Sequence, residues 1–291
     1  MNYSPDPIAL SLKSRKSNII GVIVPEIVHY FFSTVLHGIE DYAYSSGYNV
    51  MICESNESFE RELKNVDALL SNRSDGILVS LTKNTQNFDH FKKIRDSGIP
   101  LVFFDRICKS IDTDRVIVDD EKGSFEAVEH LISIGCRNIA HLSAPGHLII
   151  SQQRKAGYIR ALETNGVPVN PNLIIKCDTI EEAKKSIPAL LARIPRPDGI
   201  FSVNDLTAAE AIKIIKEIGL KVPDDIAVVG FTNGQISDLT DPTLSSVEQH
   251  GYEIGKQAAT LLIDRIEKQE DYASITRVIE TKFILKASST R

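Results

Sequence analysis

The chain has 291 residues, of which 42% are hydrophobic and 25% are charged, a composition typical of globular proteins. The formal net charge of −6 argues against broad nucleic-acid binding by the body of the chain. The four cysteines form no CxxC pair, and no apolar run is long enough for a secretion signal or a membrane span. We therefore expect a cytoplasmic protein with no cofactor, no bound metal and no membrane partner.

The first residues predict a short helical connector. Asp6 can cap a helix at its N-terminus, and Pro7 suits the first helical position. Ala9 and Leu12 then fall on one face of about two helical turns, and a basic stretch follows. A helix this short is marginal alone in water. We therefore expect residues 1–17 to be a linker remnant whose upstream partner is absent from this sequence.

From residue 19 onward, apolar strands alternate with amphipathic helices. Continuous apolar runs are typical of strands buried on both faces of a sheet, and they occur at 18–25, 48–53, 76–81 and 99–105. Helical spacing of apolar residues fills the intervals, and glycines end the helices. This order predicts a parallel sheet with helices on both faces.

The same pattern then restarts with a strand expected at 137–143. Residues 198–201 repeat the pattern of 75–78, and residues 226–231 repeat that of 99–104, at offsets of 123 and 127 residues. Matches at nearly constant offset indicate an internal duplication. We therefore expect an α/β fold of two tandem Rossmann-like lobes.

The last part of the chain does not extend this tandem simply. A short strand, a helix and a final strand are expected at 244–247, 251–268 and 275–285. We expect these segments to complete both lobes, so that several parallel crossings make a hinge. The expected crossings lie near 118–120, 247–249 and 278–281. The expected lobes are 18–118 plus 248–278 for the N-terminal lobe and 119–247 plus 279–291 for the C-terminal lobe.

Ligands of open parallel sheets bind beyond the carboxyl ends of the strands, so two such lobes would share a cleft. Residues expected at those ends offer aromatic faces, a carboxylate, a guanidinium, and amide or hydroxyl groups. This set suits a sugar or a similar polyol. The candidate ligand-binding residues are Phe31, Phe32, Asp105, Arg154, Asn204 and Thr232.

Structural roles compete with ligand binding at these strand ends. Asp205 is expected to cap the following helix at its N-terminus rather than to bind ligand. Phe31 and Phe32 can both belong to the core, since one of them lies on an apolar helix stripe. Asp105 and Arg154 can be surface charges. The sequence leaves these alternatives open.

No motif indicates catalysis. The sequence contains no GxSxG, HExxH, Walker A or GxGxxG pattern, and its seven histidines are never paired at metal-ligand spacing. We therefore expect a binding domain rather than an enzyme, with no catalytic residue.

Eight fragments along the chain form a joint pattern that is more specific than any one of them. They are IIGVIVPEIVHYFFSTVLHGIE at 19–40, PLVFFDR at 100–106, VDD at 118–120, GCRNI at 135–139, RKAGY at 154–158, SVND at 202–205, VVGF at 228–231 and PTLSSVEQ at 242–249. Together with the two lobes and the basic lead-in, they resemble the LacI/GalR family of bacterial transcription regulators.

The resemblance implies a two-lobed effector domain of the periplasmic-binding-protein type, preceded by a helix-turn-helix headpiece that this sequence lacks. Family members are usually dimers that bind palindromic operators, and a small ligand alters their operator affinity. The resemblance also implies which residues lie in the effector cleft: Asp105, Arg154 and Asn204, together with Phe31, Phe32 and Gln249.

The segment Tyr3-x-Pro5-Asp6-x-x-Ala9-x-x-Leu12 resembles the family's hinge helix. In the family, the leucine wedges into the minor groove when two subunits meet on DNA, and such wedges kink the duplex by partial unstacking. The resemblance therefore makes Pro5, Ala9 and Leu12 the expected DNA-hinge residues.

The chain departs from the family pattern at Thr232-Asn233, where an aspartate is common. This departure removes one carboxylate from the expected sugar contacts. The expected function is the effector-binding and dimerisation region of a LacI/GalR-type regulator, a homodimer that reaches operator DNA through its hinge helix and headpiece. The alternatives are a transport or chemosensory sugar-binding protein of the same fold and a sugar-modifying enzyme.

Overall fold

The computed structural model describes residues 16–268 and 273–291, and the chain divides into two compact units. Unit 1 comprises the described residues up to Ile117 and those of Gly251–Val278, and unit 2 comprises Val118–His250 and Ile279–Arg291. The chain thus passes between the units three times. The second passage follows His250, so Gln249 belongs to unit 2. The expected hinge residues Pro5, Ala9 and Leu12 lie outside the described residues.

Unit 1 is built on a six-stranded sheet with the order β11-β5-β4-β3-β1-β2. Its strands are β1 (Ile19–Val24), β2 (Asn49–Glu54), β3 (Gly76–Val79), β4 (Leu101–Phe104), β5 (Asp114–Val118) and β11 (Thr276–Ile279). The pairs β1–β2, β1–β3, β3–β4 and β4–β5 are all parallel. This arrangement follows from the alternation of strands and helices, because parallel neighbours need crossover helices.

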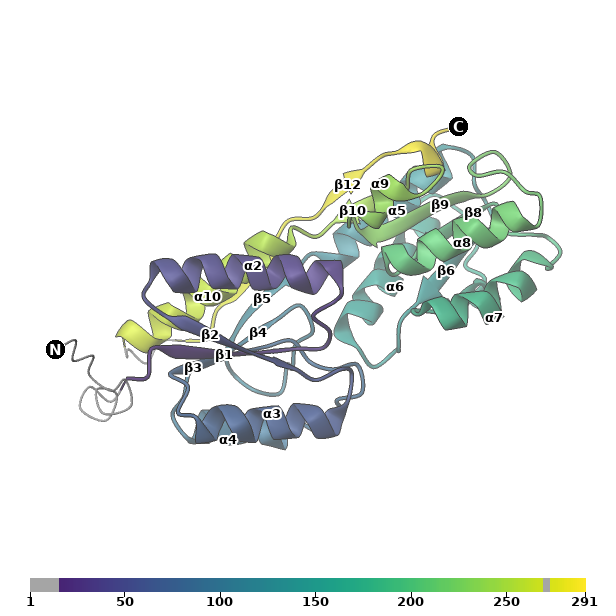
Figure 1. Ribbon diagram of the computed structural model, residues 1–291. Coiled ribbons are helices and arrows are strands. Elements are labelled where there is room, and N and C mark those ends of the chain that lie inside the picture. Colours follow the sequence, from purple (N-terminus) through teal and green to yellow (C-terminus); the bar gives the residue numbers. More distant parts are fainter. Residues whose placement is uncertain (1–15, 269–272) are drawn as a thin grey trace. The chain divides into compact units, whose positions relative to one another are not determined.

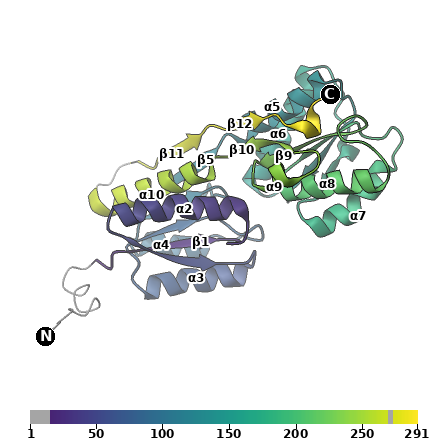
Figure 2. The same ribbon diagram turned by 45° about the horizontal axis from the view of Figure 1, so that its top comes forward.

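Helices cover both faces of this sheet, as Figures 1 and 2 show. The helices are α2 (Tyr30–Ser45) and α10 (Gly251–Lys268) on one face, and α3 (Phe59–Ser71) and α4 (Asp89–Asp96) on the other. Helices α2 and α10 pack closely because each has a glycine at the contact. A Cβ added to Gly38 would lie 2.0 Å from the backbone oxygen of Tyr252, and one added to Gly255 would lie 2.0 Å from that of Val35. Any side chain there would force the helices apart.

Unit 2 repeats this plan with the strand order β12-β10-β9-β8-β6-β7. Its strands are β6 (Ile139–Ser143), β7 (Ile174–Lys176), β8 (Gly199–Ser202), β9 (Ala227–Thr232), β10 (Ser245–Glu248) and β12 (Lys282–Ile284). All neighbours are parallel except β10 and β12, which are antiparallel. The predicted α/β fold with two helix-flanked parallel sheets is therefore confirmed.

Alternate residues of the unit 2 strands enter two different cores. Ile200 and Val228 pack on the side of α7 (Ile180–Leu191) and α8 (Asp205–Glu217), whereas Phe201 and Val229 pack on the opposite side. The helices on that opposite side are α5 (Asp120–Ser133) and α6 (Ile149–Thr164). This two-sided burial explains why the strands read as continuous apolar runs. A one-turn helix, α9 (Ile236–Leu239), follows β9.

The single strand predicted over 275–285 is wrong. The structure has two strands there, β11 in the unit 1 sheet and β12 in the unit 2 sheet. The chain passes between the units after Val278, so the pairing partner changes and Glu280 and Thr281 interrupt the extended run. Apolar patterning alone cannot reveal such a change of partner.

In the ranges 16–268 and 273–291, no helix is long and apolar enough to cross a membrane. The same residues contain no group of three or more His, Cys, Asp or Glu side chains that could hold a metal ion.

Candidate functional site

Asp105 lies at the carboxyl edge of the unit 1 sheet, directly after β4. Asp105 is 7% exposed. Its backbone has a φ of +56°, a left-handed conformation that turns the chain sharply at the end of the strand. The hydroxyl of Ser80, which follows β3, donates to Oδ2 of Asp105 at 3.5 Å. The carboxylate is therefore a buried acceptor rather than a surface charge.

Arg106 forms an ion pair at the same edge. Its Nη1 donates to Oε1 of Glu57 at 2.7 Å, and the two side chains are 17% and 12% exposed. The backbone N–H of Lys83 also donates to Glu57, at 2.7 Å. The Arg106 guanidinium lies 5.6 Å from the ring centre of Phe32, a cation–π contact. Arg106 thus links a carboxylate and an aromatic ring of this edge.

Phe31 and Phe32 are both buried and pack edge-to-face, with ring centres 5.2 Å apart. They lie in the first turn of α2, directly after its N-cap residue His29. Burial, and then the nearby Arg106, lower the pKa of His29 and so disfavour its protonated form. In the part of the chain that the structure describes, Nδ1 of His29 is buried and has no hydrogen-bond partner.

Arg154 forms a fully buried ion pair in unit 2. Its Nε donates to Oδ1 of Asp120 at 2.7 Å, and the side chains are 5% and 2% exposed. Its Nη1 donates to the backbone oxygen of Val203 at 2.6 Å, and its guanidinium lies 3.8 Å above the ring of Phe231. Burial raises the pKa of Asp120, and the guanidinium of Arg154 opposes that rise.

Thr232 and Gln249 lie together at the carboxyl ends of β9 and β10. The Thr232 hydroxyl donates to Oε1 of Gln249 at 3.0 Å, and both residues are buried. Thr232 has a φ of 138° and Asn233 a φ of 55°, so the chain turns after β9 as it does after β4. The backbone N–H of Asn233 donates to the Ser246 hydroxyl at 3.0 Å, and Nδ2 of Asn233 donates to Glu248 at 2.8 Å.

Asn204, rather than Asp205, caps α8, so the predicted cap is wrong by one residue. Oδ1 of Asn204 accepts the backbone N–H of Thr207 at 2.8 Å. Asp205 is buried and instead accepts the Gly234 backbone N–H at 2.8 Å and the Ser246 hydroxyl at 2.5 Å. Both residue types suit a cap, and the buried donors of the loop after β9 decide which one takes it.

The predicted residues fall into two groups, one at the carboxyl edge of each unit. The unit 1 group contains Phe31, Phe32 and Asp105, and the unit 2 group contains Arg154, Asn204, Thr232 and Gln249. Asp120 and Glu57 are not among the predicted site residues, although they form ion pairs with Arg154 and Arg106. The pair Asp119-Asp120 directly after a strand is a signal for Asp120; Glu57 lies in a loop with none.

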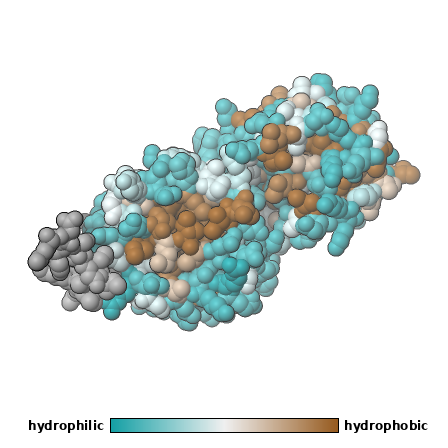
Figure 3. Space-filling model, in the orientation of Figure 1, coloured by the Kyte–Doolittle hydropathy of each residue, from teal (hydrophilic) through white to brown (hydrophobic). Residues whose placement is uncertain are grey.

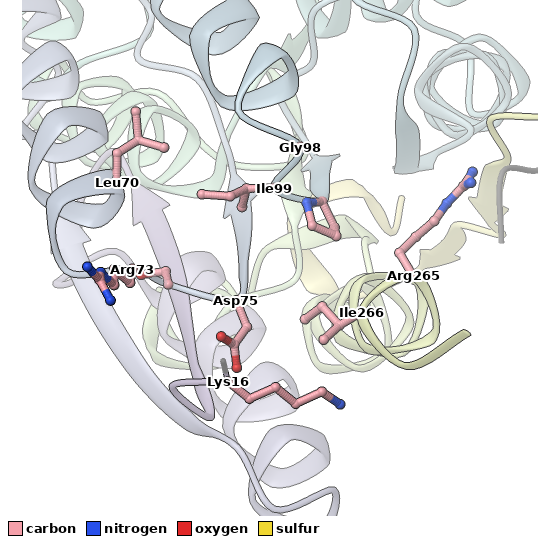
Figure 4. Close-up of a pocket in the computed structure, with 10 residues that line it drawn as sticks. Lys16, Leu70, Arg73, Asp75, Gly98, Ile99, Arg265 and Ile266 are labelled. Atoms are coloured by element: carbon pink, nitrogen blue, oxygen red, sulfur yellow. The ribbon is translucent and has the colours of Figure 1, made fainter. Parts of the chain in front are cut away.

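A separate hollow of about 560 Å³ lies at the amino edge of the unit 1 sheet, shown in Figure 4. Its lining consists of Lys16, Leu70, Arg73, Ser74, Asp75, Gly98, Ile99, Pro100, Arg265 and Ile266. Asp75 accepts the backbone N–H of Ser17 at 2.8 Å, and Arg265 pairs with Asp114 at 2.7 Å. The hollow contains none of the predicted site residues, and ligands of parallel sheets bind at the other edge. We do not assign the effector to it.

Comparison with known proteins identifies the family. The model of the periplasmic binding protein-like domain family matches residues 128–289. The chain is 34% identical over 270 residues to the ribose operon repressor of Halalkalibacterium halodurans, an alignment that covers 92% of this chain and 79% of that protein. It is 33% identical over 274 residues to the HTH-type transcriptional repressor PurR of Vibrio campbellii, covering 93% of this chain and 81% of that protein.

Solved structures agree with these relatives. A LacI family transcriptional regulator from Enterococcus faecium with bound ribose superposes with a TM-score of 0.82 at 25% identity, covering 93% of this chain and 98% of that one. The family model spans more than half of the chain, and the relatives align along most of its length. The chain therefore belongs to the LacI/GalR family of transcription regulators and spans their effector domain.

Proposed function

We propose that this chain binds a sugar and that the bound sugar alters the affinity of the regulator for operator DNA. The observation that carries the proposal is the set of hydrogen-bonding side chains at the two carboxyl edges. Asp105 supplies an acceptor. Nη2 of Arg154 makes no hydrogen bond to any described residue and supplies a donor. Thr232 and Gln249 supply both kinds of group. Sugar hydroxyls need such mixed partners.

D-ribose is the first effector to test. One relative is a ribose operon repressor, and one structural neighbour has ribose bound. The sugar can act only through its different affinity for two states of the regulator, and the three passages of the chain between the units are the proposed hinge.

The sugar proposal predicts that Asp105→Asn removes most of the thermal stabilisation by D-ribose. The variant keeps the shape of the side chain but loses a charge-assisted hydrogen bond, worth about 1.5–3 kcal/mol of binding free energy. Asp67→Asn is the matched control, because Asp67 is an exposed aspartate on α3 of the same unit. Full ribose stabilisation of Asp105→Asn would refute the site. If only a purine stabilises the wild type, the sugar proposal is wrong.

We expect a homodimer in the cytoplasm, because the family acts on operators as dimers. Figure 3 shows an apolar area on unit 1 between α2 and α3, over the β2 edge of the sheet. Ile52 of this edge strand is 43% exposed. An exposed apolar edge strand is a surface that proteins normally cover. Sedimentation equilibrium of the purified chain tests the dimer, and a monomer at all concentrations would contradict it.

Operator binding is proposed to involve the hinge residues Pro5, Ala9 and Leu12 together with a headpiece. The expected result is that this chain alone binds operator-like DNA poorly, whereas a form carrying a headpiece binds it and responds to the sugar. The relatives favour a regulator over a transport protein or an enzyme, because they are transcription repressors. Turnover of D-ribose by the purified chain would contradict this choice.

A further inference from the structure

Lys286 lies in the C-terminal segment of unit 2, and its ammonium group is fully engaged. Its Nζ donates to Oδ1 of Asn233 at 3.0 Å, to the Ser237 hydroxyl at 2.7 Å and to Oδ1 of Asp238 at 2.6 Å. The side chain is only 15% exposed. Three acceptors match the three donors of an ammonium group. Asn233 lies in the turn directly after β9, and Ser237 and Asp238 lie in the following helix α9, so Lys286 ties this turn to α9.

The turn is connected onward to the end of β10. Nδ2 of Asn233 donates to Oε2 of Glu248 at 2.8 Å, and Oε1 of Glu248 accepts the backbone N–H of His250 at 2.8 Å. The Glu248 side chain therefore bonds to the backbone of His250 and spans Gln249, which lies between them in sequence. The positive φ of His250, 54°, shows how tightly the chain bends there. The backbone on both sides of Gln249 is thus held through Asn233.

Both polar atoms of the Asn233 side chain form hydrogen bonds within the protein. Its Oδ1 accepts from Lys286 and from the Ser237 hydroxyl, the latter at 3.2 Å, while its Nδ2 donates to Glu248. At the ends of β9 and β10, the side chains proposed to meet the effector are those of Thr232 and Gln249, which are hydrogen-bonded to each other. Their orientation depends on the turn and on the bend that Asn233 joins.

We propose that Lys286 is a positioning residue for effector binding, which orients Thr232 and Gln249 through Asn233 and Glu248. The inference rests on the proposed function, in which Thr232 and Gln249 contact the sugar. Lys286 itself does not contact the effector. Groups that orient a binding residue commonly decide its affinity, because a small misplacement weakens several hydrogen bonds together.

The backbone of Lys286 is held independently of its ammonium group, so a side-chain substitution tests the ammonium alone. The Lys286 backbone N–H donates to the Ser245 hydroxyl at 2.8 Å, and that hydroxyl donates to the Lys286 carbonyl at 2.9 Å. The next turn is held by Ser288, whose hydroxyl donates to the Val228 carbonyl at 2.6 Å. Lys286→Met therefore keeps the segment in place while removing the three ammonium bonds.

The first measurement is the affinity for D-ribose by isothermal titration calorimetry. We expect Lys286→Met to weaken binding about tenfold or more, the loss expected for one charge-assisted contact, and Lys286→Arg to restore most of it. Lys185→Met makes the same chemical change on the exposed face of α7 and should leave affinity unchanged. Wild-type affinity in Lys286→Met would overturn the proposal.

The second measurement needs no effector and separates this inference from the proposed function. Amide hydrogen exchange should accelerate about tenfold at Asn233 and His250 in Lys286→Met, with helix α7 unchanged. Glu248→Gln should accelerate exchange at His250 without affecting the Lys286 contacts. If the wild type does not bind D-ribose, the ribose proposal fails and exchange still decides the positioning role. Unchanged exchange at His250 in Lys286→Met would overturn that role.

Discussion

The two units place an arginine at equivalent edges but bury it to different degrees. In unit 2, the side chains of Arg154 and Asp120 are 5% and 2% exposed, whereas those of Arg106 and Glu57 in unit 1 are 17% and 12% exposed. Both pairs have the same 2.7 Å separation. Coulomb attraction and the penalty for an unpaired charge both grow as water is excluded. We therefore expect the loss of an arginine to lower the free energy of unfolding more in unit 2 than in unit 1, although the two ion pairs have the same separation.

The duplication has preserved the turn at these edges rather than its chemistry. At the repeat offset of 127 residues Asp105 corresponds to Thr232, and both have a positive φ, 56° and 138°, as does the next residue, Asn233, with 55°. Asp105 offers a carboxylate, while Asn233 is bound to Lys286 and Glu248. The same backbone turn thus presents a hydrogen-bond acceptor in unit 1 and an asparagine that is bonded within the protein in unit 2. The comparison can be tested by removing each charge in turn.

The largest effect should follow Arg154→Met. The substitution fills the space of the arginine stem but leaves Asp120 buried without its counterion. Removing one partner of a buried pair typically lowers the free energy of unfolding by about 3–5 kcal/mol. Urea unfolding at neutral pH measures the change. A loss below about 1 kcal/mol would show that Asp120 is neutral or solvated in the folded state.

A double variant separates the buried charge from lost packing. Arg154→Met combined with Asp120→Asn should be more stable than Arg154→Met alone, since no unpaired charge remains. The Arg154–Asp120 ion pair also limits how the effector site can be tested. If Arg154→Met loses ribose binding, the cause can be either the lost contact with the sugar or the lower stability of the protein. Asp105→Asn is the cleaner test of binding.

The fold could be predicted because its signals are local and repeated. The helix predicted over 251–268 is observed with these bounds as α10. Parallel pairing then follows from the order of strands and helices, and it brings residues at the strand ends to one edge of each sheet. Local sequence therefore indicates which edge carries polar groups such as Asp105 and Thr232.

The partners of those polar groups could not be predicted, because they depend on tertiary contacts. Arg154 pairs with Asp120 from a helix 34 residues earlier. Asn204 caps α8 because Asp205 accepts buried donors from a loop about thirty residues later. No periodicity records which of two adjacent polar residues meets such a donor. The hydrogen-bond and ion-pair partners of these side chains could therefore be identified only from the structure.

A smaller effect is expected from Asp205→Asn and should depend on pH. Burial is the main cause that raises the pKa of Asp205 to about 6; the Ser246 hydroxyl, the Gly234 N–H and Lys286 oppose the rise, and Glu248 adds to it. A carboxyl whose pKa rises on folding contributes stability below its unfolded pKa, and this contribution is lost as pH rises through the folded pKa. Wild type should therefore lose about 2 kcal/mol relative to Asp205→Asn between about pH 4.5 and about pH 7.5.

Urea unfolding of both proteins across this pH range gives the difference directly. Asparagine can accept the Gly234 N–H and donate to Ser246, so the variant keeps the contacts without the charge. Parallel pH profiles for the two proteins would contradict a raised pKa.

The smallest effect should follow Arg106→Met, the unit 1 counterpart of Arg154→Met. Its partner Glu57 is partly exposed and still accepts the Lys83 backbone N–H, so it remains hydrated and hydrogen-bonded after the change. We expect a loss of about 1 kcal/mol in the free energy of unfolding, and it should shrink with added salt because water reaches the pair. The Arg154→Met loss should barely respond to salt. A salt-insensitive loss in Arg106→Met equal to that in unit 2 would show that burial does not distinguish the two edges.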